Sequence, residues 1–334
     1  MTDPHNTPQA RLMQALFGVM VTKCISAVAS MDVADALKDG PLYYTDLAAV
    51  VGADQRALHR VMRMLVSVGI FDEPTPGSFG LNELSDLLRS DVHGSLRDMA
   101  VMITSESHWV PWGELENILR TGDSGPQHAF GKDLFSWFQD QSNREQWEIF
   151  NAAMTSFSGA VAKAAVEAYD FSRFNRIIDV GGGHGYFLRS LLNEAPEANG
   201  VLFDLPGVIE SAIKFDRMEP VDGDFFLYVP DGGDCYTLKN ILHDWDDEKC
   251  VQLLKNIANA MKPSARVLVI ESVMPDSAEP HPAKFMDVNM LAMTEGGCER
   301  TLNEYSVLLD KAGLRLKEVY PTPGAVSIIE AGRN

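Results

Sequence analysis

Basic residues are scarce in this chain. It has 28 Lys and Arg residues against 47 Asp and Glu residues, which gives a net charge of −19 over 334 residues. A protein that binds nucleic acid or an anionic membrane needs a basic surface, so neither is expected as the main partner. Hydrophobic residues make up 46% of the chain and charged residues 22%, which is ordinary for a globular protein with a sizeable core.

Cysteines and long apolar runs are also few. The four cysteines are Cys24, Cys235, Cys250 and Cys298, and their spacing fits neither a disulfide framework nor a metal site. We expect them to be reduced, as in an intracellular protein. The apolar run at residues 12–21 is soon followed by Lys23 and is too short to span a bilayer. It also lacks the leader and cleavage site of a signal peptide, so a cytoplasmic location is expected.

Glycines gather at one place. Residues 176–186 read Arg-Ile-Ile-Asp-Val-Gly-Gly-Gly-His-Gly-Tyr, an apolar strand followed by four glycines within five positions. A strand that ends in glycines before an amphipathic helix lets the backbone approach a nucleotide-like ligand. Asp204 lies 25 residues after Asp179 at the end of a second apolar strand, where a carboxylate suits a ribose diol. These features predict an adenosine-containing cofactor.

A dinucleotide fits the glycine loop poorly. The third glycine of the dinucleotide motif would fall at Tyr186 or Leu188, counted from Gly181 or Gly183. Asp179 would also repel a pyrophosphate. A carboxylate beside the loop better suits S-adenosylmethionine (SAM), which carries an ammonium and a sulfonium and no phosphate. The alternative to a ligand site is an ordinary tight turn in an α/β protein.

Strands and helices alternate from about residue 174, which predicts an α/β fold with a doubly wound sheet and helices on both faces. The expected strands are residues 177–180, 201–203, 234–238, 266–270, 315–320 and 325–330. Ligands in such folds bind at the carboxyl ends of the strands. Asp179, Asp204, Lys239 and Glu271 all fall at such ends.

The first part of the chain has a different pattern. Residues 12–90 are mainly helical, with a short hairpin expected around the Pro/Gly turn at 69–81. This arrangement resembles a winged helix, but the acidic chain lacks the basic face of a DNA-binding regulator. Apolar residues on the first helices belong either to the core of a monomer or to a dimer interface: Met13, Phe17, Met20 and Met31.

Three residues form a candidate catalytic set. His243 lies just beyond a predicted strand end, and its near-neutral pKa suits a general base, although a lone histidine is more often structural. Two acids could orient it. Glu271 ends the next strand, and Glu299 precedes a helix, where it could instead complement the helix dipole. No cluster with metal-ligand spacing is visible, so no metal is expected.

Five motifs occur in order along the chain. They are Asp179-Val-Gly-Gly-Gly-His-Gly, Phe203-Asp-Leu-Pro, Gly223-Asp-Phe-Phe, Leu238-Lys-x-x-Leu-His-Asp-Trp and Gly296-Gly-x-Glu-Arg-Thr. Together they resemble the SAM-dependent O-methyltransferases of the caffeic-acid/hydroxyindole type, and the resemblance covers nearly the whole chain. It implies a winged-helix-like dimerisation domain at residues 1–105, a helical linker or substrate lid at 106–170 and a SAM-binding domain at 171–334. It also implies a homodimer that methylates a hydroxyl of an aromatic small molecule.

The resemblance also implies roles for individual residues. For SAM these are Gly181 and Gly183 at the methionine part, Asp204 at the ribose hydroxyls, Asp224, Phe225 and Lys239 at the adenine, and Ser158 at the carboxylate, and Asp179 and Leu205 are also expected to bind SAM. For the substrate they are Phe150, Met154, Asp244, Met290 and Thr294. His243 is the base, held by Glu271 and Glu299. Residues 213–223 are several residues shorter than in the family, so a truncated helix and strand are expected before Asp224.

Other chemistry stays open at this point. Some relatives keep SAM and catalyse decarboxylation, hydroxylation or ring closure, often without the base, and the presence of His243 favours methyl transfer. An N-methyltransferase is a further alternative, and an NAD-dependent oxidoreductase is disfavoured by the missing third glycine. The sequence does not identify the acceptor.

Overall fold

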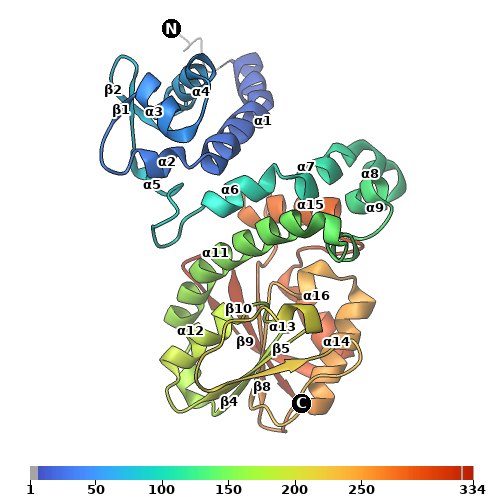
Figure 1. The fold of residues 1–334 in the computed structure, drawn as a ribbon. Helices are drawn as coiled ribbons and strands as arrows, with labels where there is room; N and C mark the ends of the chain where they lie inside the picture. The colour runs from blue at the N-terminus through green and yellow to red at the C-terminus, as the bar shows by residue number, and fades with distance from the viewer. Residues whose placement is uncertain (1–6, 325, 334) are drawn as a thin grey trace. The chain divides into compact units, whose positions relative to one another are not determined.

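The computed structural model describes residues 7–324 and 326–333, and the chain forms two compact units. The first unit comprises the chain up to Trp109 together with Asp140–Phe157. The second comprises Val110–Gln139 and Ser158–Asn334. Figure 1 shows the order of the elements along the chain. The division into three parts at residues 105 and 170 stays a prediction.

The first unit is mainly helical with a small sheet. Its helices are α1 (Pro8–Ser30), α2 (Val33–Ala36), α3 (Tyr44–Val51), α4 (Gln55–Ser67), α5 (Glu83–Asp86), α6 (Arg97–Ile103), the start of α7 (Glu106–Gly113), η2 (Gln141–Asn143) and the first part of α11 (Arg144–Ala168). The strands β1 (Leu42–Tyr43), β2 (Asp72–Thr75) and β3 (Ser78–Gly80) pair antiparallel in the order β1-β3-β2. The hairpin predicted at 69–81 is therefore confirmed, and the winged-helix resemblance stays a prediction.

Helix α1 is longer than the apolar run that predicted it. It spans 23 residues and is long and apolar enough to cross a membrane by length and composition alone, so the expectation that this segment is too short was wrong. Lys23 lies within the helix, and its ammonium donates to the Thr104 carbonyl at 3.1 Å and lies over the Trp109 ring. Only 17% of the most apolar stretch is buried. Its exposed apolar residues are Leu12, Met13, Leu16, Phe17, Val19 and Met20.

The second unit is built on a seven-stranded sheet in the order β6-β5-β4-β7-β8-β10-β9. Its strands are β4 (Arg176–Val180), β5 (Asn199–Asp204), β6 (Met218–Asp222), β7 (Cys235–Lys239), β8 (Arg266–Glu271), β9 (Leu314–Pro321) and β10 (Ser327–Arg333). The first five strands are parallel, and β10 runs antiparallel to both β8 and β9. The predicted α/β sheet is confirmed.

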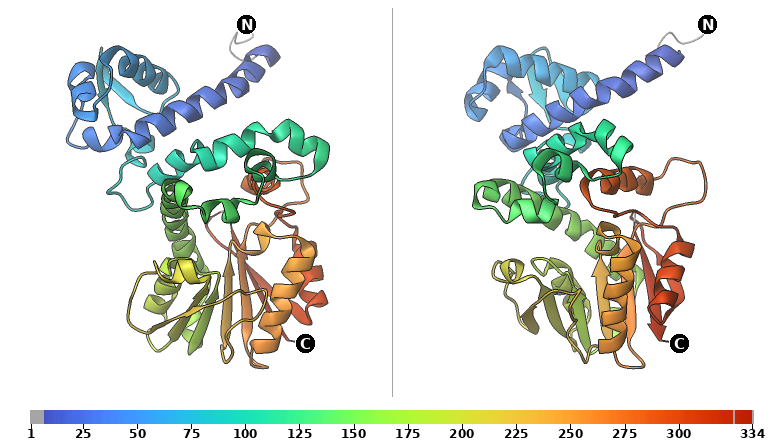
Figure 2. Two further views of the ribbon diagram at one scale, coloured as in Figure 1. Left: turned by 45° about the vertical axis from the view of Figure 1, so that its right-hand side comes forward. Right: turned by 90° about the vertical axis from the view of Figure 1, so that its right-hand side faces the viewer.

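Helices cover both faces of this sheet. The second unit contains the end of α7, α8 (Leu115–Thr121), α9 (Gly125–Phe130), α10 (Leu134–Phe138), the rest of α11, η3 (Phe171–Arg173), α12 (Tyr186–Glu194), α13 (Pro206–Ile209), η4 (Leu242–Asp244), α14 (Asp247–Ala260), α15 (Pro282–Met293) and α16 (Leu302–Lys311). Figure 2 shows α14 and α16 on one face and α12 on the other. Every residue of β4 and β8 after the first is buried, and most of these residues are apolar because both faces of the sheet are covered.

The chain between β5 and Asp224 differs from expectation. The helix there is reduced to the four residues of α13, but β6 is an intact strand that pairs with β5 along its whole length. The expectation of a truncated strand was therefore wrong. Only Met218 and Val221 of β6 are half-buried, and the other three residues are exposed, as on an edge strand. Its apolar pattern is too weak for a prediction from sequence. The predicted start of β10 at Ala325 lies outside the described residues.

Candidate active site

The sheet brings four predicted site residues to one edge. Asp204 ends β5, Lys239 ends β7 and Glu271 ends β8, while Asp179 is the next-to-last residue of β4. The strand order places β4 between β5 and β7, so the chain leaves β4 in one direction and later returns on its other side. A ligand crevice forms at such a switch point. Lys239 is half-buried, and burial lowers its pKa.

The glycine loop after β4 needs its glycines for backbone geometry. Gly181, Gly183 and Gly185 have φ angles of 69°, 58° and 86°. These values are unfavourable for other residues. A Cβ atom on Gly181 would lie 2.6 Å from the Ile241 side chain, whereas a Cβ atom on Gly183 would meet nothing within 4 Å. The backbone at Gly183 therefore borders open space that a ligand can approach.

Asp204 is tied to this loop. Its Oδ2 accepts a hydrogen bond from the Gly183 amide at 2.8 Å, and its Oδ1 accepts one from the Leu205 amide at 2.7 Å. Burial raises the pKa of Asp204, and the two amides oppose that rise. A carboxylate has about four lone-pair positions, so two remain for the hydroxyls of a ribose.

Asp179 lies below the loop rather than at its surface. The side chain is buried, and its Oδ1 accepts a hydrogen bond from the Thr237 hydroxyl at 2.7 Å. Its Oδ2 is buried without a hydrogen-bond partner. A Cβ atom on Gly182 would lie 2.6 Å from that oxygen. Burial raises the pKa of Asp179 to about 6.

Hydrogen bonds from side chains of α14 fix the segment that follows β6, at residues 224–226. Asp224 accepts a hydrogen bond from the Phe226 amide at 2.8 Å. Asn256 donates to the Phe225 carbonyl at 2.9 Å, and Gln252 donates to the Phe226 carbonyl at 2.8 Å. The Asn256 and Gln252 contacts were not predicted, because nothing in an amphipathic helix indicates which exposed amide reaches a distant loop.

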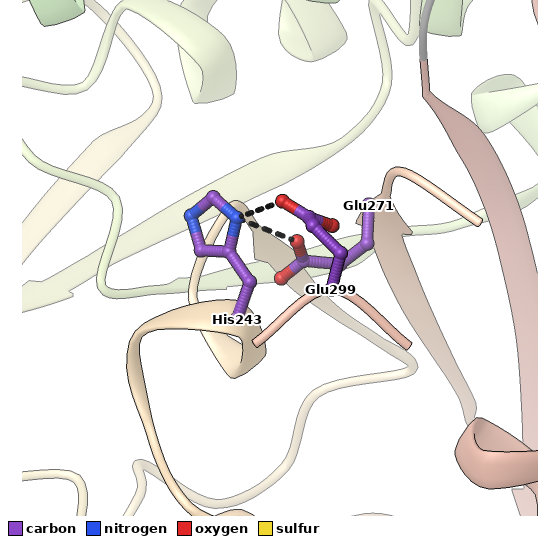
Figure 3. Close-up of side chains that lie close together, drawn as sticks. All are labelled: His243, Glu271 and Glu299. Atoms are coloured by element: carbon purple, nitrogen blue, oxygen red, sulfur yellow. Dashed lines mark hydrogen bonds and ion pairs between the residues drawn. The ribbon is translucent and has the colours of Figure 1, made fainter. Parts of the chain in front are cut away.

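His243 meets both predicted glutamates (Figure 3). Its Nδ1 lies 2.8 Å from Glu299 Oε1 and 3.5 Å from Glu271 Oε2. Its Nε2 lies 3.6 Å from Asp244 Oδ1. Burial by itself lowers the pKa of His243, but the carboxylates of Glu271, Asp244 and Glu299 raise it to about 10. The predicted set of His243, Glu271 and Glu299 is thus brought together in space.

Each glutamate is fixed from its own side. Glu271 is fully buried, and its Oε1 accepts hydrogen bonds from the Ile241 and Leu242 amides at 2.8 and 2.9 Å. Burial raises the pKa of Glu271 to about 7. The side chain of Glu299 does not cap α16, because Thr301 does so in a capping box. Glu299 is thus not the capping residue of α16, and its Oε1 contacts His243.

The same three residues could offer ligands to a metal ion. One atom from each lies within 4.8 Å of the others. However, the 2.8 Å between His243 Nδ1 and Glu299 Oε1 is a hydrogen-bond distance. Two ligands of a tetrahedral zinc ion with bonds of about 2.0–2.1 Å lie roughly 3.3 Å apart. The geometry therefore suits a proton between the two atoms better than a metal.

The remaining predicted residues divide between the two units. In the second unit, Met290 is buried in α15, Ser158 is half-buried in α11, and the Thr294 hydroxyl donates to the Met290 carbonyl at 2.8 Å. Phe150 and Met154 belong to the first unit, and the structure does not relate them to His243. Their substrate-binding roles stay predictions.

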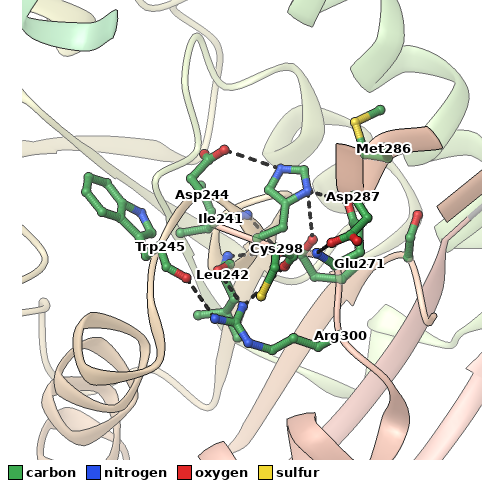
Figure 4. Close-up of polar contacts among 12 residues, drawn as sticks. Ile241, Leu242, Asp244, Trp245, Glu271, Met286, Asp287, Cys298 and Arg300 are labelled. Atoms are coloured by element: carbon green, nitrogen blue, oxygen red, sulfur yellow. Dashed lines mark hydrogen bonds and ion pairs between the residues drawn. The ribbon is translucent and has the colours of Figure 1, made fainter. Parts of the chain in front are cut away.

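Two residues that sequence reasoning missed surround the glutamates (Figure 4). Asp287 of α15 accepts a hydrogen bond from the Glu299 amide at 3.0 Å. Arg300 is buried and bonds to the loop that carries His243. For Arg300 the signal in the sequence was the Glu-Arg-Thr motif itself, in which only the glutamate was assigned a role.

The fold and the site define a methyltransferase that uses SAM. Residues 13–91 match the O-methyltransferase dimerisation domain, and residues 112–315 match the O-methyltransferase domain. The chain belongs to this O-methyltransferase family and is a SAM-dependent O-methyltransferase. The resemblance inferred from the five motifs is confirmed.

Relatives match over nearly the full length. The chain is 37% identical to a phenazine O-methyltransferase of Lysobacter antibioticus over 96% of this chain and 95% of the relative. The crystal structure of a protein named LaPhzM superposes on the present structure with a TM-score of 0.92 at 37% identity. The superposition covers 98% of this chain and 100% of that one. A mitomycin biosynthesis 6-O-methyltransferase of Streptomyces lavendulae is 35% identical over 95% of this chain and 93% of the relative. Human N-acetylserotonin methyltransferase in complex with SAM gives a TM-score of 0.90 at 27% identity, with both chains fully covered.

Proposed function

We propose that this enzyme transfers the methyl group of SAM to a phenolic or enolic hydroxyl of an aromatic small molecule, with His243 as the general base. The observation that carries the proposal is the buried contact of His243 Nδ1 with Glu299 at 2.8 Å. The substrate class rests on relatives that are named as methyltransferases of a phenazine and of mitomycin biosynthesis. A role in secondary metabolism follows from the same names.

The loop at the carboxyl edge of the sheet suits SAM. Gly183 borders open space, and Asp204 has acceptor capacity left for a ribose diol. We assign Gly181, Gly183 and the unpartnered oxygen of Asp179 to the methionine part, which carries positive charge. The remaining SAM residues are Leu205 beside the ribose, Asp224, Phe225 and Lys239 around the adenine, and Ser158 at the carboxylate. When bound, SAM supplies an electrophilic methyl group.

His243 is suited to take a proton from a phenol. A phenol has a pKa of about 10 by analogy with tyrosine, and the three carboxylates raise the pKa of His243 from its ordinary value towards that of a phenol. A smaller difference in pKa lowers the free-energy cost of the proton transfer. Because Nδ1 is held by Glu299, Nε2 is the nitrogen left to accept the proton. A raised pKa also means that the free enzyme carries a protonated His243 at neutral pH, so the base form increases as the pH rises.

The acceptor pocket is proposed from residues near the base and from the family pattern. Asp244 lies beside Nε2 of His243. Thr294 and the His243 carbonyl both border Gly297, since a Cβ atom there would lie 2.2 Å from the Thr294 hydroxyl and 2.4 Å from that carbonyl oxygen. Met290 accepts the Thr294 hydroxyl bond. The substrate roles of Phe150 and Met154, which lie in the first unit, rest on the family pattern alone.

We also propose a homodimer and a cytoplasmic location. The support for the dimer is the match of residues 13–91 to a dimerisation domain, together with the exposed apolar residues of α1. A dimer interface would remove these side chains from water, which accounts for an apolar helix on the surface of the unit. Cysteines without disulfide spacing support the location.

The proposal is tested with purified enzyme, SAM and a panel of aromatic acceptors, with products identified by mass. We expect a gain of one methyl group on a hydroxyl. His243→Ala should lose methylation and still bind SAM in calorimetry, whereas the exposed His93→Ala serves as the matched control with unchanged turnover. Turnover by His243→Ala at the level of the unaltered enzyme would show that another group is the base.

A further inference from the structure

The three residues of the proposed catalytic set come from three separate segments. His243 lies in η4, after β7. Glu271 ends β8, and Glu299 lies in the turn before α16. No single helix or strand sets the distance between His243 and Glu299, so some other contact has to hold the two loops together. A displacement of about 1 Å in such a pair can lower the rate about 10²-fold.

Arg300 makes those contacts. Its side chain is 2% exposed. Its Nη1 donates to the Leu242 carbonyl at 2.9 Å, and its Nη2 donates to the Trp245 carbonyl at 2.8 Å. These carbonyls lie on either side of His243 in the sequence. The guanidinium also pairs with Asp247 at 3.0 Å, at the start of α14.

The backbone of Arg300 reaches the third segment. Its carbonyl accepts a hydrogen bond from the Met274 amide at 2.9 Å, and it forms a parallel bridge with Val273, two residues beyond Glu271. Gly297 packs against the His243 carbonyl so closely that a Cβ atom there would lie 2.4 Å from its oxygen. The turn that carries Glu299 is therefore joined to both other segments.

We infer that Arg300 is a positioning residue that sets the contact between His243 and Glu299. The inference rests on the proposed role of His243. Burying a guanidinium is costly unless its donors are paired, and here the planar fork reaches two carbonyls and a carboxylate at once. A lysine keeps the charge but has a single ammonium, which cannot reproduce the fork. Arg300 acts through His243 and does not itself contact the substrate.

The test is Arg300→Lys. We expect kcat to fall about 10²-fold, because the base is displaced, while the KM for SAM stays within about twofold. The pH–rate profile should also change. His243 faces Glu271, Glu299 and Asp244, and loss of the Glu299 contact should move the rise in rate to lower pH. In a Glu299→Gln background the same substitution should add little further loss, because the two act through one contact.

Arg266→Lys is the matched control. Arg266 also pairs with a carboxylate, Glu330, at 2.8 Å and donates to the carbonyls of Ser264 and Ala265, but it lies at the amino end of β8. Its replacement should leave kcat and the pH profile unchanged. An Arg300→Lys enzyme that melts at a lower temperature but keeps wild-type kcat and pH profile would overturn the inference.

A second variant keeps the test decisive if Arg300→Lys does not fold. Asp247 is largely exposed, so Asp247→Asn should be tolerated, and it weakens the anchor of the guanidinium. We expect a fall in kcat of about two- to fivefold, in the range of a partly exposed ion pair, with the same direction of pH shift. Unchanged kcat and profile in this variant would then overturn the inference. Full activity of His243→Ala would instead refute the proposed function.

Discussion

Replacement of Glu299 by glutamine removes one negative charge from beside His243 and keeps the size of the side chain. The contact is a buried hydrogen bond of 2.8 Å between His243 Nδ1 and Glu299 Oε1. Hydrogen bonds to charged groups contribute about 1.5–3 kcal/mol, and one pKa unit corresponds to about 1.4 kcal/mol. The pKa of His243, raised to about 10 by three carboxylates, should therefore fall by about 1–2 units in Glu299→Gln.

The sign of the effect on the rate follows from the proton that His243 must lose. Deprotonation of His243 in the free enzyme should occur at lower pH in the variant, so the rise of kcat/KM with pH shifts to lower pH. The maximum rate should fall by about 10²-fold or more, because a weaker base with a less well oriented ring accepts the phenol proton.

The measurement is initial rate against pH from about pH 6 to about pH 11, which brackets the ordinary pKa of a histidine and the raised pKa of His243, about 10. SAM is kept saturating, and calorimetry checks that its binding is unchanged. The exposed Glu295→Gln, four residues earlier, is the matched control and should leave the profile unaltered. A Glu299→Gln enzyme whose profile rises at the same pH as the unaltered enzyme would refute the assignment of His243 and Glu299 as a coupled pair.

Three further predictions concern cofactor binding, folding and assembly. Asp204→Ala should weaken SAM binding about 10- to 100-fold in calorimetry, because a charged acceptor for the ribose is lost; unchanged affinity would contradict that role. Gly181→Ala should lower the free energy of unfolding by about 1–3 kcal/mol in urea titration, since φ is 69° there and a Cβ atom would lie 2.6 Å from Ile241; equal stability would count against strain at the loop. Leu16→Glu on α1 should convert the proposed dimer to a monomer in light scattering, with Leu119→Glu, on an exposed part of α8, as the control. A Leu16→Glu protein that keeps the mass of the unaltered one would place the interface elsewhere.

The local pattern of apolar residues was sufficient to predict the central strands of the sheet. Buried parallel strands are apolar along their length, so β4, β5, β7 and β8 stood out in the sequence, and the polar residue at each carboxyl end marked the ligand edge. The edge strand β6 did not stand out, because only two of its five residues are half-buried. The apolar run at residues 12–21 was judged too short to cross a membrane, because the sequence does not show where the helix around it begins and ends; α1 spans 23 residues.

In the candidate site, too, some features could be predicted from the sequence and others only from the structure. The sequence supplied His243, Glu271 and Glu299 as candidates, because strand ends and glycine turns are visible locally. The sequence left open whether Glu299 complements a helix dipole or contacts His243. The structure shows the contact, a distance of 2.8 Å between two residues that are 56 apart in the chain. The sequence also assigned Asp179 to the cofactor site, and the structure shows how that side chain is held, buried beneath the glycine loop against Thr237.

By itself, the sequence indicated the class of enzyme. A glycine loop after an apolar strand, acids at strand ends and a histidine beyond a strand end depend on residue type and short-range spacing, and five motifs in order resemble the O-methyltransferase family. The tertiary structure decided how those groups work together. The pKa of His243 depends on three carboxylates from three segments, and the contacts of Arg300 with Leu242 and Trp245 join loops more than fifty residues apart. Electrostatic and hydrogen-bond energies depend on distances of a few ångströms, and only the folded chain sets those distances.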